Sequence, residues 1–125
     1  MTRLSAIKQI SVNARELPRA VAFYRDALGM QHLFDAGPHM SFFDAGGVRL
    51  MLSVAEKPEF DHPSSILYFD VPDIHAAHGE LAARGVSFRD SPHLVAKMPG
   101  REIWMCFLDD SEGNLFAITS EVASA

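Results

Sequence analysis

The chain has 125 residues, of which 48% are hydrophobic and 22% charged, and this balance is typical of one folded domain and excludes a disordered chain. The formal net charge is −5 and lysine and arginine form no run, so we expect no nucleic-acid partner. No signal peptide and no apolar run of membrane-spanning length occurs in the sequence, so we expect no membrane partner and a cytoplasmic location.

The first third of the chain begins with a strand and a helix. Polar and apolar residues alternate over residues 9–13, a pattern typical of a half-buried strand. Helical spacing then runs from Leu17 to Leu28, with Pro18 in the first turn and Gly29 at the position that ends a helix. Tyr24 on this helix is expected to bury its ring.

The rest of the first half predicts three strands. They cover residues 31–35, 40–44 and 48–54, and the last two flank Ala45-Gly46-Gly47, a hairpin turn.

The second half repeats this plan. The same offset of 57 residues separates Gln9 from Ile66 and Leu17 from Ile74, which indicates an internal duplication. We expect a strand at 67–71, a helix that begins at Pro72-Asp73 and ends at Gly85, and later strands at 86–89, 103–108 and 115–119. Residues 90–101 are expected to form a long loop that covers a site.

Alternating strand residues point to opposite faces of a sheet, which separates a core face from a possible ligand face. The core face should lie under the two helices and carries apolar residues: Ile10, Val12, Leu50, Leu52, Leu67, Phe69, Phe116 and Ile118. The opposite face mixes polar and apolar residues and would line a ligand pocket, unless it is simply exposed to solvent. The candidate ligand-binding residues on this face are Gln9, Ser11, Arg49, Met51, Ser53, Ile66, Tyr68 and Ala117, and Trp104 is expected in or near the same pocket.

Two motifs at opposite ends of the chain carry a family resemblance. IKQISVNARELPRAVAFYRDALGM (residues 7–30) and FLDDSEGNLFAITSE (residues 107–121) resemble the first strand and helix and the last hairpin of the vicinal oxygen chelate superfamily, the glyoxalase/bleomycin resistance protein/dioxygenase type. The resemblance implies an α+β fold in which two βαβββ modules form a cup-shaped mixed sheet. One domain, 1–125, would comprise module one at 5–56, a linker at 57–63 and module two at 64–121.

The resemblance also implies four metal-binding positions, because enzymes of this family usually hold a divalent metal with His, Glu or Gln side chains. The alignment places Gln9, Met51, Ile66 and Ala117 there. Only the Gln9 amide could coordinate such an ion, since a thioether is a poor ligand for it and isoleucine and alanine offer no donor. We therefore expect no metal at the family site and no cofactor.

Acid and base candidates exist apart from that site. His39 and His93 each follow a proline and, with Tyr68 and Glu102, could transfer protons in an enzyme; they could equally be inert residues at the rim of the cup. His75 and His78 are spaced to share an ion, although a solvated helix face explains them as well. Cys106 lies in an apolar run, where a buried and inert thiol is expected.

Three functional hypotheses follow. The first is a metal-independent protein that sequesters or carries a hydrophobic or aromatic ligand. Such a protein would resemble the family's bleomycin-binding members, which sequester a ligand without metal catalysis. Those members act as dimers, so a homodimer is expected for this chain too. The second is a lyase, isomerase or hydrolase that uses these acid/base residues or a non-standard metal site. The third is an interaction module whose pocket is filled by side chains such as Trp104.

Overall fold

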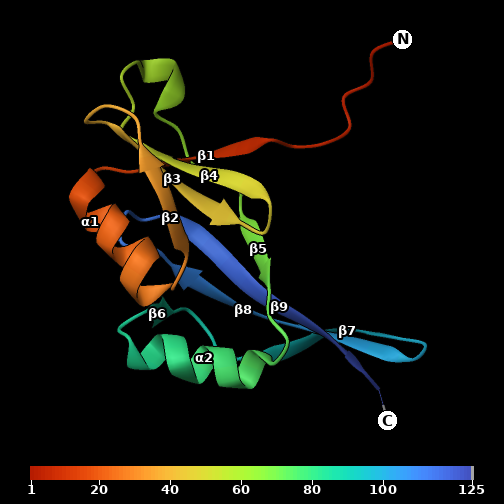
Figure 1. Cartoon of the computed structure of the whole chain (residues 1–125). Helices are drawn as coiled ribbons and strands as arrows, with labels where there is room; N and C mark the ends of the chain where they lie inside the picture. The colour runs from red at the N-terminus through yellow and green to blue at the C-terminus, as the bar shows by residue number, and fades with distance from the viewer. Residues whose placement is uncertain (125) are drawn as a thin grey trace. The chain divides into compact units, whose positions relative to one another are not determined.

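The chain folds into two units that each contain a mixed sheet and one main helix, as the computed structural model describes for residues 1–124 (Figure 1). The first unit is Met1–Ser64 and the second begins at Ser65. The sheets have four and five strands. This α+β architecture confirms the expected fold class.

The first unit follows a βαβββ order. Its elements are β1 (Gln9–Asn13), α1 (Leu17–Ala22), η1 (Phe23–Ala27), β2 (Gln31–Asp35), β3 (Met40–Ala45), β4 (Val48–Ser53) and the short η2 (Pro58–Phe60). The strand order is β1-β4-β3-β2, in which β1 is parallel to β4 and the other neighbours are antiparallel. The expected strands and the β3–β4 hairpin are confirmed.

The expected helix from Leu17 to Leu28 is present but changes its winding. It begins as α1 and continues as η1, a π-helical segment in which Leu28 N–H donates to the carbonyl of Phe23. Gly29 follows with φ of 71°, a conformation that glycine adopts without strain. Tyr24 is fully buried as expected, and its ring centroid lies 6.0 Å from that of Phe43 on β3.

The second unit contains β5 (Leu67–Asp70), α2 (Ile74–Ala83), β6 (Ser87–Phe88), β7 (His93–Met98), β8 (Arg101–Asp109) and β9 (Leu115–Ala123). The predicted helix start is confirmed, because the Asp73 carboxylate caps α2 by accepting hydrogen bonds from the backbone N–H groups of His75 and Ala76 at 3.1 Å. The strand order is β5-β9-β8-β6, and β7 also pairs with β8.

The expected long loop at residues 90–101 is wrong. Most of it forms β7, which pairs antiparallel with β8 through a turn at Pro99-Gly100 (Figure 1). The register shifts between Leu94 and Ala96, and such a bulge interrupts the alternation by which a strand is recognised in sequence. His93 therefore begins an edge strand.

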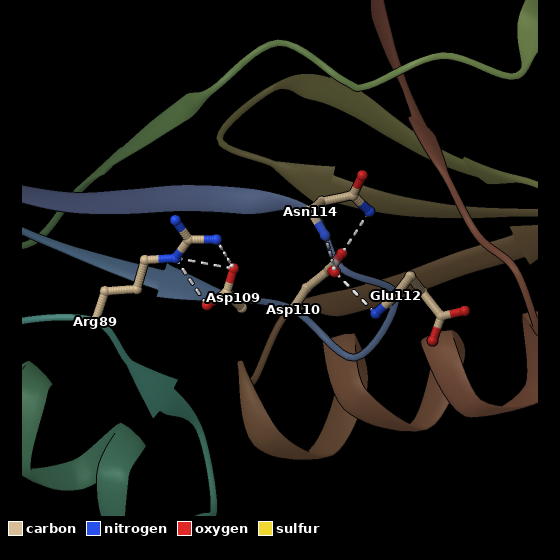
Figure 2. A network of polar contacts seen from close by, with 5 residues as sticks. All are labelled: Arg89, Asp109, Asp110, Glu112 and Asn114. Carbon is tan, nitrogen blue, oxygen red and sulfur yellow. Dashed lines mark hydrogen bonds and ion pairs between the residues drawn. The ribbon is translucent and has the colours of Figure 1, made fainter.

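The loop between β8 and β9 is held by one buried carboxylate (Figure 2). Asp110 is 7% exposed, and its Oδ1 accepts hydrogen bonds from the backbone N–H groups of Glu112 and Asn114, both at 2.8 Å. Its Oδ2 accepts a third from the Asn114 side-chain amide at 2.8 Å. Beside it, Arg89 pairs with Asp109 at 2.7 Å on a more exposed surface. The family-like DDSEGN segment is thus a structural loop.

Most of the predicted core face is buried, whereas Ile10, Leu67 and Phe69 are only half-buried. Val12, Leu50 and Leu52 have no exposed surface in the first unit, and α1 packs against this side of β3 and β4. Phe116 and Ile118 on β9 are buried in the second. No helix within residues 1–124 combines the length and apolar character needed to cross a membrane.

Candidate functional site

The candidate site of the first unit lies on the sheet face opposite the core. The register pairs Gln9 with Arg49 and Ser11 with Met51 on the parallel strands β1 and β4, so these four side chains project to one side. Their neighbours Val12, Leu50 and Leu52 alternate to the buried side. The structure therefore brings together five of the predicted ligand-binding residues on one surface: Gln9, Ser11, Arg49, Met51 and Ser53.

Arg49 is held in place by several contacts on this surface. Its Nε donates a hydrogen bond to Gln9 Oε1 at 2.9 Å. Its guanidinium carbon lies 5.2 Å from the ring centroid of Phe42 and 5.7 Å from that of Phe34, within the range of cation–π attraction. These two rings stack on each other with centroids 4.5 Å apart. Contacts on three side chains thus define where the guanidinium lies.

Because of these contacts, the aligned residues that the structure describes in this unit offer no free side-chain oxygen to coordinate a metal ion at the position that the family uses. Gln9 Oε1, the one suitable oxygen in that set, already accepts a hydrogen bond from Arg49. The Gln9 amide nitrogen lies 3.6 Å from Met51 Sδ, so the amide group is held at both ends. The positive charge of Arg49 would repel a metal ion bound to the same oxygen. The donor set in this unit does not fit the family metal.

A cleft of about 200 Å³ adjoins this surface within the first unit. Hydroxyl, amide, apolar and charged side chains line it: Ser11, Asn13, Met40, Ser53, Val54, Ala55, Glu56, Lys57 and Phe60. The segment after β4 is tied to β1, because Asn13 N–H donates to Ser64 Oγ and the Asn13 side-chain amide donates to the carbonyl of His62. Two predicted ligand-binding residues, Ser11 and Ser53, therefore lie in a real depression.

In the second unit, aromatic rings cover the position aligned with a metal ligand. Ala117 on β9 lies between Tyr68 on β5 and Phe107 on β8 in the sheet register. The two rings meet edge to face with centroids 6.1 Å apart, and Ala117 is fully buried. The fourth aligned residue, Ile66, precedes β5 and is 44% exposed. Neither aligned residue offers a metal donor.

Trp104 and Glu102 lie apart from Tyr68, on the other side of the second sheet, so the expectation that Trp104 lines the same ligand face is wrong. Trp104 contacts His75 of α2 with ring centroids 5.4 Å apart, and its indole N–H donates to Glu102 Oε1 at 3.1 Å. Both residues line a separate cleft of about 390 Å³ beside α2. The reason is strand parity: residues 103, 105 and 107 of β8 share the side of Tyr68, and 102 and 104 do not.

The two predicted histidines occupy different units. His39 precedes β3 and is exposed, and its carbonyl accepts a hydrogen bond from Val54 N–H at 3.0 Å. His93 begins β7, where its Nδ1 lies 3.0 Å from the Ser91 carbonyl and 3.7 Å from the Asp90 carboxylate. His93 thus has a carboxylate neighbour.

Other predicted side chains form separate contacts. The His78 ring lies 4.3 Å from that of Phe88, and the His75 ring lies against Trp104. Throughout residues 1–124 no group of three or more His, Cys, Asp or Glu side chains is placed to hold a metal ion. Cys106 is fully buried, and burial, with a smaller contribution from Asp90, raises the pKa of its thiol to about 11. These features agree with an inert Cys106.

One polar cluster was missed from the sequence. His32 Nε2 lies 2.8 Å from Asp35 Oδ1 and 3.0 Å from Ser41 Oγ, and the Ser41 hydroxyl donates to Asp35 Oδ1 at 2.7 Å. The hydrogen bond from Ser41, and then that from His32, lower the pKa of Asp35. Ser41 is fully buried and cannot meet a substrate, so the cluster holds β2 against β3. A bulge between His32 and Phe34 brings His32 to the side of Asp35, and sequence spacing does not predict it.

Solved structures with the same fold share little sequence with this chain. A lactoylglutathione lyase from Agrobacterium tumefaciens is 20% identical, with a TM-score of 0.70 over 95% of this chain and 96% of that one. A superfamily member from Sphaerobacter thermophilus DSM 20745 is 19% identical, with a TM-score of 0.76 over 94% and 98%. A virulence protein from Salmonella typhimurium is 20% identical, with a TM-score of 0.76 over 97% and 100%. These likenesses show the fold alone.

A comparison with curated proteins gives no match. The family comparison is decisive, because residues 6–118 match the Glyoxalase/Bleomycin resistance protein/Dioxygenase superfamily. Together with the two mixed sheets, this match identifies the chain as a member of the Glyoxalase/Bleomycin resistance protein/Dioxygenase superfamily.

Proposed function

We propose that this protein binds a small hydrophobic or aromatic molecule without a metal, and that it sequesters or carries this ligand. The observation that carries the proposal is the hydrogen bond from Arg49 to Gln9 Oε1, because it puts a cation against the one side chain that could serve as a family metal ligand. A protein that relied on the family metal would gain nothing from that arrangement.

The surface next to Arg49 suits such a ligand. The cleft beside it is lined by Met40 and Phe60 as well as by the hydroxyl groups of Ser11 and Ser53. Pockets for organic molecules combine apolar walls with a few polar groups that orient the ligand. Methionine adapts its shape to different ligands because its side chain is unbranched and flexible.

An enzymatic function has less support. Of the four acid/base candidates, Glu102 accepts a hydrogen bond from Trp104 and lies 4.0 Å from Lys97, away from Tyr68. The lactoylglutathione lyase among the similar structures motivates one direct assay of lyase activity, with and without added divalent metal. Measurable turnover that is lost in His93→Ala, with folding retained, would favour the enzyme.

Blocking the cleft tests the proposal. Thermal-shift measurements with a panel of aromatic and aliphatic compounds, in buffer containing EDTA, should find stabilising ligands for the native protein. Ser53→Trp should fill the cleft and abolish the shift, and Ser5→Trp on the exposed N-terminal segment is the matched control. Equal shifts in both variants, or none with the native protein, would contradict the proposal.

We also propose that the protein is a homodimer. Light scattering coupled to size-exclusion chromatography should give twice the chain mass of 13.8 kDa, and a mass of one chain would contradict this.

A further inference from the structure

We propose that the ligand of the first unit is a planar organic acid whose carboxylate is bound by Arg49. This inference rests on the proposed ligand-binding function and adds the chemical class of the ligand. Three features support it: the contacts that orient Arg49, the Nη donors of its guanidinium that have no carboxylate partner among the described residues, and the apolar side chains next to it.

Arg49 is oriented before any ligand arrives. Gln9 Oε1 accepts from its Nε, and the Phe34–Phe42 stack lies against its guanidinium. A preorganised side chain loses less conformational entropy when it binds a ligand, so this arrangement favours recognition. A purely structural arginine would be expected to pair its charge with a neighbouring carboxylate.

Arg49 does not pair its charge in this way. Asp44 is its register partner on β3, but the Asp44 carboxylate accepts a hydrogen bond from Gly47 N–H at 3.1 Å in the hairpin turn. Among the described residues of the first unit, no carboxylate forms an ion pair with Arg49. Its Nη groups thus keep the planar fork of donors that matches a carboxylate.

The side chains around the Arg49 guanidinium favour a ligand whose carboxylate is attached to a flat, mainly apolar ring system. Phe34 is 44% exposed beside the guanidinium, and Met51 follows on the same side of β4. The cleft begins at Ser53, four residues from Arg49 on one strand, a separation of roughly 13 Å. A one-ring acid would reach only Phe34 and Met51, whereas a two-ring acid would extend toward Ser53. One guanidinium suits a monoanion better than a phosphate dianion.

Matched pairs of acids and amides test the inference. Titration calorimetry in EDTA would compare benzoate, 2-naphthoate and biphenyl-4-carboxylate with their neutral amides. We expect each acid to bind about 10- to 100-fold more tightly than its amide, as for a hydrogen bond to a charged group, with the two-ring acids tightest. Arg49→Gln should remove the preference, Arg49→Lys should keep part of it, and Arg3→Gln on the exposed N-terminal segment should leave it unchanged.

The possible results separate the two proposals. Acids and amides that bind equally well, or an acid preference that survives Arg49→Gln in a variant with native circular dichroism, would overturn the role of Arg49 and leave the binding function standing. Absence of binding by every acid and every amide would overturn both. A preference for acids over amides that is lost in Arg49→Gln and kept in Arg3→Gln would support both the binding function and the role of Arg49.

Discussion

Replacing Asp110 by alanine should destabilise the protein strongly, although the residue lies in a loop. The buried carboxylate accepts three hydrogen bonds of 2.8 Å, two of them from backbone N–H groups (Figure 2). Alanine leaves these donors without their acceptor at a site where Glu112 and Asn114 are also buried. Hydrogen bonds to charged groups contribute about 1.5–3 kcal/mol each and do not add fully, so we expect a loss of about 3 kcal/mol.

Two neighbouring substitutions calibrate this prediction. Asp110→Asn keeps an oxygen for both backbone donors but turns its amide nitrogen toward that of Asn114, so it should cost about 1–2 kcal/mol, less than Asp110→Ala. Asp109→Asn breaks an ion pair with Arg89 whose side chains are 57% and 31% exposed, and it should cost less than about 1 kcal/mol. Urea unfolding followed by circular dichroism measures the free energy of unfolding of the three variants. In thermal unfolding, Asp110→Ala should lower Tm by about 10 °C. An Asp110→Ala protein as stable as Asp109→Asn would show that the buried carboxylate does not hold the loop.

Three further predictions concern the core, the thiol and the polar cluster. Leu52→Ala should reduce the free energy of unfolding by about 2–5 kcal/mol because Leu52 is fully buried, and a loss below about 1 kcal/mol in urea unfolding would contradict this packing. Cys106, with a thiol pKa of about 11, should react slowly with a disulfide reagent at pH 8 and completely once unfolded; rapid reaction of the native protein would count against its burial. Ionised Asp35 contributes stability that is present above its ordinary pKa of about 4 and is lost as the pH falls through the lowered value, and Ser41→Ala should move that pKa upward in an NMR titration. An unchanged Asp35 titration would show that the Ser41 hydrogen bond has no such effect.

The fold could be predicted because its local patterns agree with one another. Strand β1 alternates clearly, Pro18 and Gly29 bracket the first helical segment, and Asp73 caps the second helix. The edge strand β7 could not be predicted, because its bulge and largely exposed residues remove the usual alternation.

The shared face of the candidate site could be predicted only where one side of a strand is polar. On β1 and β4 the alternation separates Gln9 and Arg49 from the buried leucines, so their shared face follows from sequence. On β8 the run from Ile103 to Leu108 is apolar on both sides, and nothing local indicates which face Trp104 takes. That choice depends on the register with β9, which pairs residues distant in sequence.

The metal content of the protein tests most directly whether this chain works without the family metal. Elemental analysis, with native mass spectrometry on the same sample, should find well under one divalent ion per chain, no change on Gln9→Ala, and an organic mass retained by the protein. One bound ion per chain that is lost in Gln9→Ala would show that Gln9 coordinates a metal, and it would contradict the proposed role of the Arg49–Gln9 hydrogen bond.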